Sequence, residues 1–166
     1  MQSVTTRAAR VEDIDTIVKL WKDLMDFHQK RDRHFTCSPS GPSIFAKFVA
    51  DQLEKEDSLV LVAEEGGAIV AYCLAITGTH SPVFAKPRHA EIIDLFVSQS
   101  HRQRGIGERL VREVEHWFSQ RGIDRIEARV AARNEVSTQF WRKIGYEPHT
   151  ETLFRELNER ANGSLG

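Results

Sequence analysis

The sequence predicts an α/β protein, of the mixed α+β kind, folded as a single domain over residues 1–166. A chain of 166 residues is long enough for one self-sufficient core, and it contains no repeat, low-complexity tract or inter-domain linker. Short β-branched and aromatic runs alternate with segments whose apolar residues recur at helical spacing. One junction, between residues 90 and 118, has the order strand, glycine turn, helix.

The composition and charge of the chain are those of an ordinary soluble globular protein. Hydrophobic residues make up 40% and charged residues 28% of the chain, which is enough apolar material for a core. The 23 basic residues nearly balance the 24 acidic ones, so we expect neither a nucleic acid nor a membrane as a partner. We find no signal-peptide core, no run of membrane-spanning length and no disulfide framework, and therefore expect a cytoplasmic location.

The N-terminal part is predicted to form a strand, a helix and a polar loop. The strand covers Val4 to Ala9. The helix begins at about Val11, where acidic residues in the first turn complement the helix dipole. Its apolar stripe consists of Ile14, Ile17, Val18, Trp21, Leu24 and Met25. Gln29 to Pro42 is rich in polar residues and proline and is predicted to be the loop.

A second helix and a β-hairpin follow. The apolar positions of this helix are Ile44, Phe45, Phe48, Val49 and Leu53. Ser58–Ala63 and Ala68–Thr77 are predicted to be the hairpin strands, because Glu65-Gly66-Gly67 between them supplies a tight turn. Thr79 to Arg88 is predicted to be a loop.

The next unit carries the strongest functional signal. Ala90 to Val97 is apolar enough for a buried strand, and a helix follows it. The apolar stripe of that helix consists of Ile106, Leu110, Val114 and Trp117. In the turn between them, Gly105 and Gly107 let the main chain approach an anion, and the helix aims its N–H groups and positive dipole end there. The turn therefore predicts a site for a phosphorylated cofactor, with Arg102 and Arg104 adding charge.

Two familiar nucleotide-binding turns do not fit this stretch. A dinucleotide fingerprint needs a third glycine three residues after the second, and Leu110 occupies that position. A P-loop needs Gly-Lys-Ser/Thr, whereas Gly107 is followed by Glu108 and Arg109. The pattern that remains is Arg-x-x-Gly-x-Gly after a strand that ends in Leu-x-Val.

The C-terminal part is predicted to contain a strand, a helix and a last strand. Gly122 and Gly145 are placed as C-cap glycines of the third and fourth helices. Ile123 to Val130 is the strand between these helices, and Asn134 stands where a helix N-cap is expected. Thr152 to Leu157 is predicted to be the last strand.

These segments resemble the GNAT superfamily of acetyl-CoA-dependent N-acetyltransferases. Leu95-Phe96-Val97 followed by Arg102-Gln103-Arg104-Gly105-Ile106-Gly107 is similar to the pyrophosphate-binding motif of that family. Asn134 to Tyr146 is similar to its second motif, in which a helix ends in glycine and an aromatic residue. The resemblance covers roughly residues 3 to 155. It implies a GNAT-type fold, with a mixed central sheet that splays between strands 4 and 5 to admit the pantetheine arm and with four flanking helices.

The resemblance implies acetyl-CoA as cosubstrate and gives each motif position a role. Backbone N–H groups from Arg102 to Gly107 would hold the pyrophosphate, and the strand backbone from Leu95 to Val97 would pair with the pantetheine. The Val97 N–H would polarise the thioester carbonyl. Arg104 could equally be surface charge, and Asn134 could cap its helix and contact the cofactor as well. The implied cofactor-binding residues are Leu95, Phe96, Val97, Arg102, Gln103, Arg104, Gly105, Ile106, Gly107 and Asn134.

Acetylation of an amine also requires a proton acceptor, because a lysine-like amine has a pKa of about 10.4. Glu91 is the first candidate, since it begins the cofactor strand, as the catalytic glutamate does in the histone-acetyltransferase branch of the family. Asp94 is the rival candidate, because many small-molecule members carry a carboxylate or amide there. Either residue could instead be an ordinary strand residue with a hydrogen-bonding role.

The chain departs from the family pattern at the general acid. Trp141 stands where the family often has the tyrosine that protonates the departing thiolate, and an indole N–H is no practical acid. Tyr146 occupies a packing position. A thiolate has a pKa of about 8.5, so departure without a dedicated acid is feasible, and water or a hydroxyl such as that of Ser137 is the alternative. The general acid is left unassigned.

The histidines do not predict a metal site. His34 and Cys37 are too sparse for a zinc site, and no metal is expected. The end of the first helix and the following loop form a wall of the acceptor pocket in the family, which makes His28, Asp32, His34 and Phe35 candidate acceptor contacts. Asp32 would suit a cationic amine, while its arginine neighbours would suit a carboxylate.

The sequence is thus read as an N-acetyltransferase that moves the acetyl group of acetyl-CoA to a primary amine of a small molecule, by direct attack in a ternary complex. One alternative is a protein N-acetyltransferase that acts on a lysine or an N-terminus. Another is a catalytically idle acyl-CoA-binding sensor, which only Trp141 favours. Homodimers are common in the family, and nothing in these residues tests for one.

Overall fold

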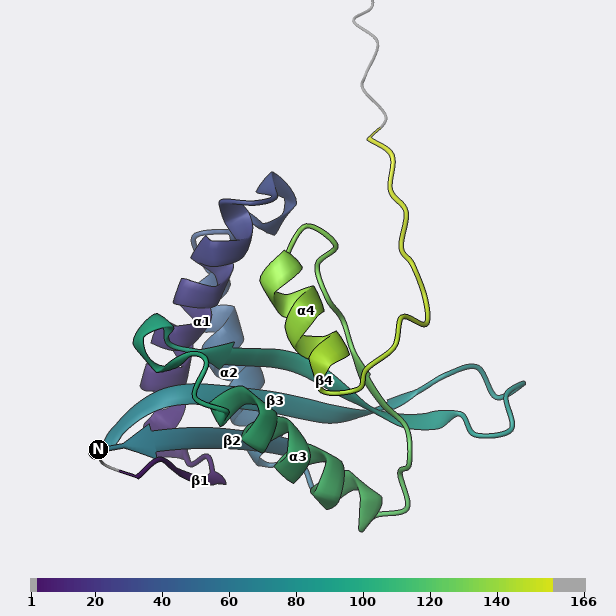
Figure 1. The fold of residues 1–166 in the computed structure, drawn as a ribbon, viewed down its shortest axis with the longest axis horizontal. Coiled ribbons are helices and arrows are strands. Elements are labelled where there is room, and N and C mark those ends of the chain that lie inside the picture. Colours follow the sequence, from purple (N-terminus) through teal and green to yellow (C-terminus); the bar gives the residue numbers. More distant parts are fainter. Residues whose placement is uncertain (1–2, 157–166) are drawn as a thin grey trace, which may run out of the picture.

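The computed structural model describes residues 3–156, which form one five-stranded sheet with helices on both faces (Figure 1). The strand order is β1-β2-β3-β4-β5; β1 to β4 pair antiparallel, and β5 runs parallel to β4. The strands are β1 (Thr5–Ala8), β2 (Ser58–Glu65), β3 (Ala68–Thr79), β4 (Arg88–Val97) and β5 (Ile126–Ala128). The α-helices are α1 (Ile14–Gln29), α2 (Gly41–Leu53), α3 (Ile106–Ser119) and α4 (Glu135–Lys143), and short 3-10 turns lie at Val11–Asp13, Arg33–Phe35 and Gln99–His101.

Two apolar clusters, one on each face, hold the layers together. Helices α1 and α2 cover one face, where Ile17 and Val49 pack against Tyr72 and Leu74 of β3. Helices α3 and α4 cover the other face, which Figure 1 presents to the viewer. The alternation of side chains along β3 and β4 separates the two clusters. Among residues 3–156, no helix is long and apolar enough to cross a membrane.

A β-bulge at Ile93 decides which face several residues of β4 take. Leu74 pairs with Asp94 and Ala75 with Ile92, so Ile93 has no partner of its own on β3. Strict alternation from Ile92, which packs on the α3 face, would also place Asp94 on that face. The extra residue instead moves Asp94 and Phe96 to the α1 and α2 face, and Leu95 to the α3 face.

The sheet opens between β4 and β5. Their parallel pairing covers only Ala90, Glu91 and Ile92 of β4. Beyond Ile92, β4 continues to Val97, but within the described residues it has no strand partner on that edge. The predicted mixed sheet, its splay between strands 4 and 5 and its four flanking helices are therefore confirmed.

The last predicted strand, Thr152 to Leu157, is wrong over its described part. Residues 151–156 have no strand structure, and Leu157 lies outside the described residues. Leu153 and Phe154 are exposed rather than facing the core, and Glu156 pairs with Arg33 beyond the end of α1 instead of joining the sheet. The predicted strand over Ile123–Val130 shortens to β5, because only its central residues reach β4.

Candidate active site

The glycine turn before α3 presents a group of free backbone donors. Gln103 and Gly105 take the left-handed conformation, with φ of 60° and 76°, which turns the chain sharply into α3. Outside the regular elements, no described backbone hydrogen bond uses an N–H between Gln103 and Gly107. A helix leaves its first N–H groups without intrahelical partners, so this turn has the donors that an anion requires.

The second glycine of the turn lies between the two motifs. Gly107 is buried, and a Cβ there would make ordinary contacts, 3.4 Å from the Phe140 ring of α4 and 3.6 Å from a Val97 methyl group. The two sequence motifs, far apart along the chain, therefore meet where α3, α4 and the end of β4 come together.

Backbone N–H groups at the free edge of β4 face the opening between β4 and β5. The Ser98 N–H donates to the Val70 carbonyl at 2.9 Å, on the β3 side. Because backbone groups alternate sides along a strand, the N–H groups of Val97 and Leu95 face the opposite, unpaired edge. This edge is adjacent in the chain to the glycine turn.

The two arginines of the turn are held differently. Arg104 pairs with Glu65 at the end of β2, with nitrogen–oxygen distances of 2.5 and 3.1 Å, and this pairing lowers the pKa of the Glu65 carboxyl. Arg102 donates from Nε to the Val97 carbonyl at 3.0 Å, and its guanidinium lies 5.3 Å from the Phe27 ring. Arg102 is thus fixed at the open edge of β4, while Arg104 braces the turn against the hairpin.

Asn134 forms the predicted helix cap. Its side chain is buried and accepts a hydrogen bond from the Ser137 N–H at 3.1 Å, at the start of α4. This contact caps the first turn of α4, the helix of the second motif.

The two candidate bases have different surroundings. Burial raises the pKa of Asp94 to about 6, although its interaction with the Tyr72 hydroxyl lowers it in part. Asp94 nevertheless keeps some exposure to solvent. Glu91 is ion-paired, with its Oε1 2.7 Å from Nε of the well-exposed Arg129. A carboxyl with a pKa of about 6 is suited to accept a proton near neutral pH.

Tyr72 is a residue of this site that sequence reasoning did not identify. Its ring is buried in the cluster on the α1 and α2 face, and within the described residues its hydroxyl makes no hydrogen bond of normal geometry. Burial, and next the charge of Asp94, raise the pKa of this phenol well above its ordinary value. No pattern in the sequence could associate Tyr72 with Asp94, because the association depends on the pairing of β3 with β4.

The aromatic residues of the second motif pack inward. Trp141 is buried, with its ring centroid 5.2 Å from that of Phe140 and 4.8 Å from that of Tyr146. The Tyr146 hydroxyl donates to Glu115 at 3.3 Å. Tyr146 thus lies at a packing position, as expected, and both residues bind α4 to its neighbours.

The candidate acceptor loop is linked to the C-terminal segment. His34 lies between two carboxylates, 2.7 Å from Asp32 and 2.8 Å from Glu156, and both raise its pKa. Asp32 also approaches Arg133 at 3.6 Å. His28 stacks on Phe35, with ring centroids 4.8 Å apart, and burial lowers its pKa. The sequence gives no sign that Glu156 and Arg133 belong to this group.

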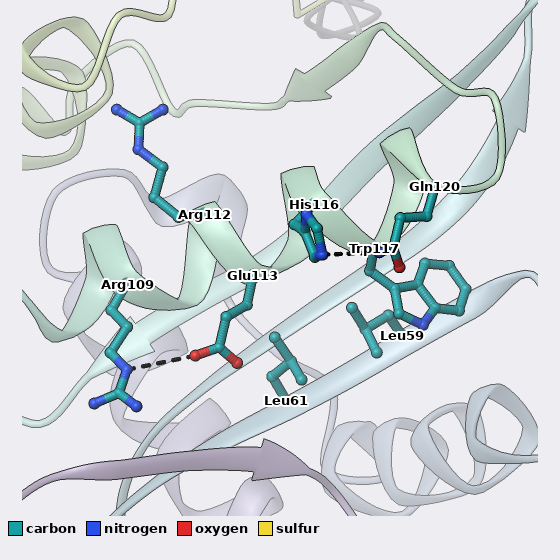
Figure 2. A pocket seen from close by; sticks show the side chains of 8 residues that line it. All are labelled: Leu59, Leu61, Arg109, Arg112, Glu113, His116, Trp117 and Gln120. Carbon is teal, nitrogen blue, oxygen red and sulfur yellow. Dashed lines mark hydrogen bonds and ion pairs between the residues drawn. The ribbon is translucent and has the colours of Figure 1, made fainter.

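A shallow hollow lies elsewhere, along α3 and β2 (Figure 2). Its lining residues are Leu59, Leu61, Arg109, Arg112, Glu113, His116, Trp117 and Gln120. None of the predicted site residues lines it, and its ion pair between Arg109 and Glu113 points from α3 toward the edge of the sheet. The two motifs therefore lie at the splay and the glycine turn, apart from this hollow.

Comparison with known proteins agrees with this geometry. Residues 19–146 match the model of the acetyltransferase (GNAT) family, which is well over half of the chain. The chain therefore belongs to this family, and the resemblance found in its motifs is confirmed.

Individual relatives are distant. The chain is 26% identical to an uncharacterized N-acetyltransferase, YhfO, from Bacillus subtilis (strain 168), over 92% of this chain and 95% of the relative. A tetramutant of the BH1408 protein from Bacillus halodurans has a TM-score of 0.79 at 24% identity, over 92% of this chain and 99% of that one. An aminoglycoside N-acetyltransferase, AAC(6')-Iy, bound to the bisubstrate analog CoA-S-monomethyl-acetylneamine, has a TM-score of 0.74 at 18% identity, over 93% and 98%. At these identities the solved structures establish the shared fold.

Proposed function

We propose that this protein is an N-acetyltransferase that moves the acetyl group of acetyl-CoA to a primary amine of a small molecule. The observation that carries the proposal is the adjacency of three features: free N–H groups in the turn, an unpaired edge of β4, and a partly exposed carboxyl with a raised pKa. Membership of the GNAT family supports it, and the complex of AAC(6')-Iy with a CoA-linked neamine analog shows that this fold admits such ligands in a relative.

Acetyl-CoA would bind across the turn and the open strand edge. The N–H groups between Arg102 and Gly107 would hold the pyrophosphate at the positive end of α3. The pantetheine arm would lie along Leu95 to Val97 and pair with their backbone as an added strand does. The Val97 N–H would then face the thioester carbonyl, where a preorganised donor stabilises the oxyanion of the tetrahedral intermediate.

The acceptor amine would attack the thioester carbon directly. A C–N bond forms, the C–S bond breaks, and the attacking nitrogen loses a proton. We assign that proton to Asp94, because its pKa of about 6 leaves the carboxylate ionised at neutral pH and still basic enough to act. Glu91 is the second candidate, and its pairing with Arg129 favours Asp94 over it. The thiolate of CoA, with a pKa of about 8.5, would leave without a dedicated acid.

The test is release of free thiol from acetyl-CoA across a panel of amines, polyamines, aminoglycosides, amino acids and basic peptides. Turnover with one class of small amine would support the proposal and identify the acceptor. Turnover with peptides alone would favour a protein N-acetyltransferase. Binding of CoA in calorimetry without turnover of any acceptor would contradict the proposal and favour a sensor role.

A further inference from the structure

Three side chains from neighbouring strands converge at the end of the sheet farthest from the glycine turn. His80 directly follows β3, His89 lies on β4 and Glu127 on β5. His80 Nε2 is 2.8 Å from Glu127 Oε1, and His89 Nε2 is 3.8 Å from Glu127 Oε2. One ligand atom from each residue lies within 4.8 Å of the other two. We propose that His80, His89 and Glu127 form a binding site for a divalent transition metal ion of the Zn²⁺ type.

The ligand set suits such an ion. Two imidazole nitrogens and one carboxylate leave open positions for water, as in zinc sites with three protein ligands and in two-histidine, one-carboxylate iron sites. Metal–ligand distances of about 2.0–2.2 Å place neighbouring ligand atoms roughly 3 to 3.5 Å apart. The distances from Glu127 to His80 and to His89, 2.8 and 3.8 Å, lie on either side of this range.

His89 is the most buried of the three residues. It is only 5% exposed, yet no described hydrogen bond uses its Nε2. Its Nδ1 lies 3.5 Å from the Pro87 carbonyl, on the side where metal-binding histidines usually hold a backbone oxygen. A Cβ on Gly78 would lie 2.5 Å from His89 Nε2, so the neighbouring strand leaves space for this ring.

One oxygen of the Glu127 carboxylate is occupied by hydrogen bonds, and the other is free of them within the described residues. Arg125 Nε lies 2.6 Å from Oε1, and Oε2, which faces His89, has no described hydrogen bond. Arg125 is therefore a competing cation on one oxygen, and the other oxygen is available to a metal.

Binding would require one local movement. The two imidazole rings are stacked, with centroids 3.9 Å apart and planes 15° from parallel. A metal lies in the plane of each imidazole that binds it, so both rings cannot bind in this stack. The His80 side chain is 35% exposed and follows the end of β3, so it can turn while His89 stays fixed. A bound ion would then link β3, β4 and the three-residue β5.

The experiment is titration of untagged, reduced protein with Zn²⁺ in calorimetry, and with Co²⁺ followed by its visible absorption. We expect about one ion per chain, and at least tenfold weaker binding in His80→Ala and in Glu127→Gln. Arg125→Ala removes the competing cation and is expected to bind the ion more tightly. His89→Gln tests the third ligand, and circular dichroism of each variant establishes that it is folded.

Two controls separate this site from other metal ligands of the chain. His116→Ala removes an exposed histidine on α3, and Cys37→Ser removes the exposed thiol; neither is expected to change the affinity. Absence of binding to the folded wild-type protein would overturn the proposal. Binding that survives in both His80→Ala and Glu127→Gln would overturn it as well, because the ion would then be held elsewhere.

Discussion

Strand β4 leaves backbone groups unpaired at its C-terminal end, whereas at its N-terminal end the backbone is paired and ionisable side chains gather. Between Leu95 and Val97 one strand edge has no partner within residues 3–156, and Arg102, from the following turn, is fixed on the Val97 carbonyl. Around His89 and Ala90 the backbone is bonded on both sides, and side chains of three strands converge. In Figure 1 these ends lie on opposite sides of the molecule, at the turn before α3 and at the β3–β4 loop.

The two ends of β4 suit different ligands. Backbone donors recognise a group by shape and charge and tolerate changes in nearby side chains, which fits a large cosubstrate such as acetyl-CoA. A cluster of imidazoles and a carboxylate depends on every member, which fits a small ion. Single side-chain substitutions at the turn should therefore have graded effects on CoA affinity. Single substitutions at the other end should have strong effects on metal affinity.

The largest effect on catalysis is expected at Asp94, the ionisable side chain that we place in the reaction. Asp94→Asn should lower turnover by about 10² to 10⁴-fold, the range typical of a general base, while CoA affinity changes little. Steady-state thiol release with an accepted amine measures this. Glu91→Gln is the matched control and should cost less; if it costs more, the base is Glu91.

The next effect is expected at Arg102. Arg102→Ala removes a charged donor at the open edge of β4 and should weaken CoA binding by about tenfold in calorimetry, with an unchanged fold. Arg121→Ala removes the same charge at the far end of α3 and should leave the affinity unchanged. Equal affinities for wild type and Arg102→Ala would remove Arg102 from the cofactor site.

A smaller effect is expected from Tyr72→Phe. The rate should fall as the pH drops through the Asp94 pKa of about 6, because the base must be ionised. The Tyr72 hydroxyl lowers that pKa, so its removal should raise the pKa and move the acidic limb of the pH–rate profile to higher pH. Thermal stability should change little, since within residues 3–156 the buried hydroxyl makes no hydrogen bond of normal geometry. An unmoved limb would argue against Asp94 as the titrating base.

The smallest effect is expected at His34, which lies outside both ends of β4. Asp32 and Glu156 raise the pKa of His34, so this pairing stabilises the fold at low pH and is lost as the pH rises through the raised value. His34 is exposed and salt screens its charge, so the change in stability should be slight. Titration of the imidazole by NMR should show the raised pKa, and Glu156→Gln should bring it closer to its ordinary value.

Much of the fold and of the cofactor site could be predicted because the signals are local. Glycines at 105, 122 and 145, the cap at Asn134 and the apolar stripes of the helices each act within a few residues of chain. The last strand was predicted wrongly by the same reasoning. A run such as Thr152–Leu157 has strand character, but pairing needs an available sheet edge, and Phe154 and Glu156 contact the loop after α1 instead.

By itself, therefore, the sequence determined the order of the elements, the glycine turn with its open N–H groups, and the family. Only the tertiary structure decided that the bulge at Ile93 puts Asp94 on the face of Tyr72, and that strand register brings His80, His89 and Glu127 together. The physical reason is how far apart in the chain the interacting residues are. Turns and caps depend on backbone conformation and hydrogen bonds between neighbours in the chain, whereas these two groups depend on pairing between residues as far apart as His80 and Glu127, which no local pattern encodes.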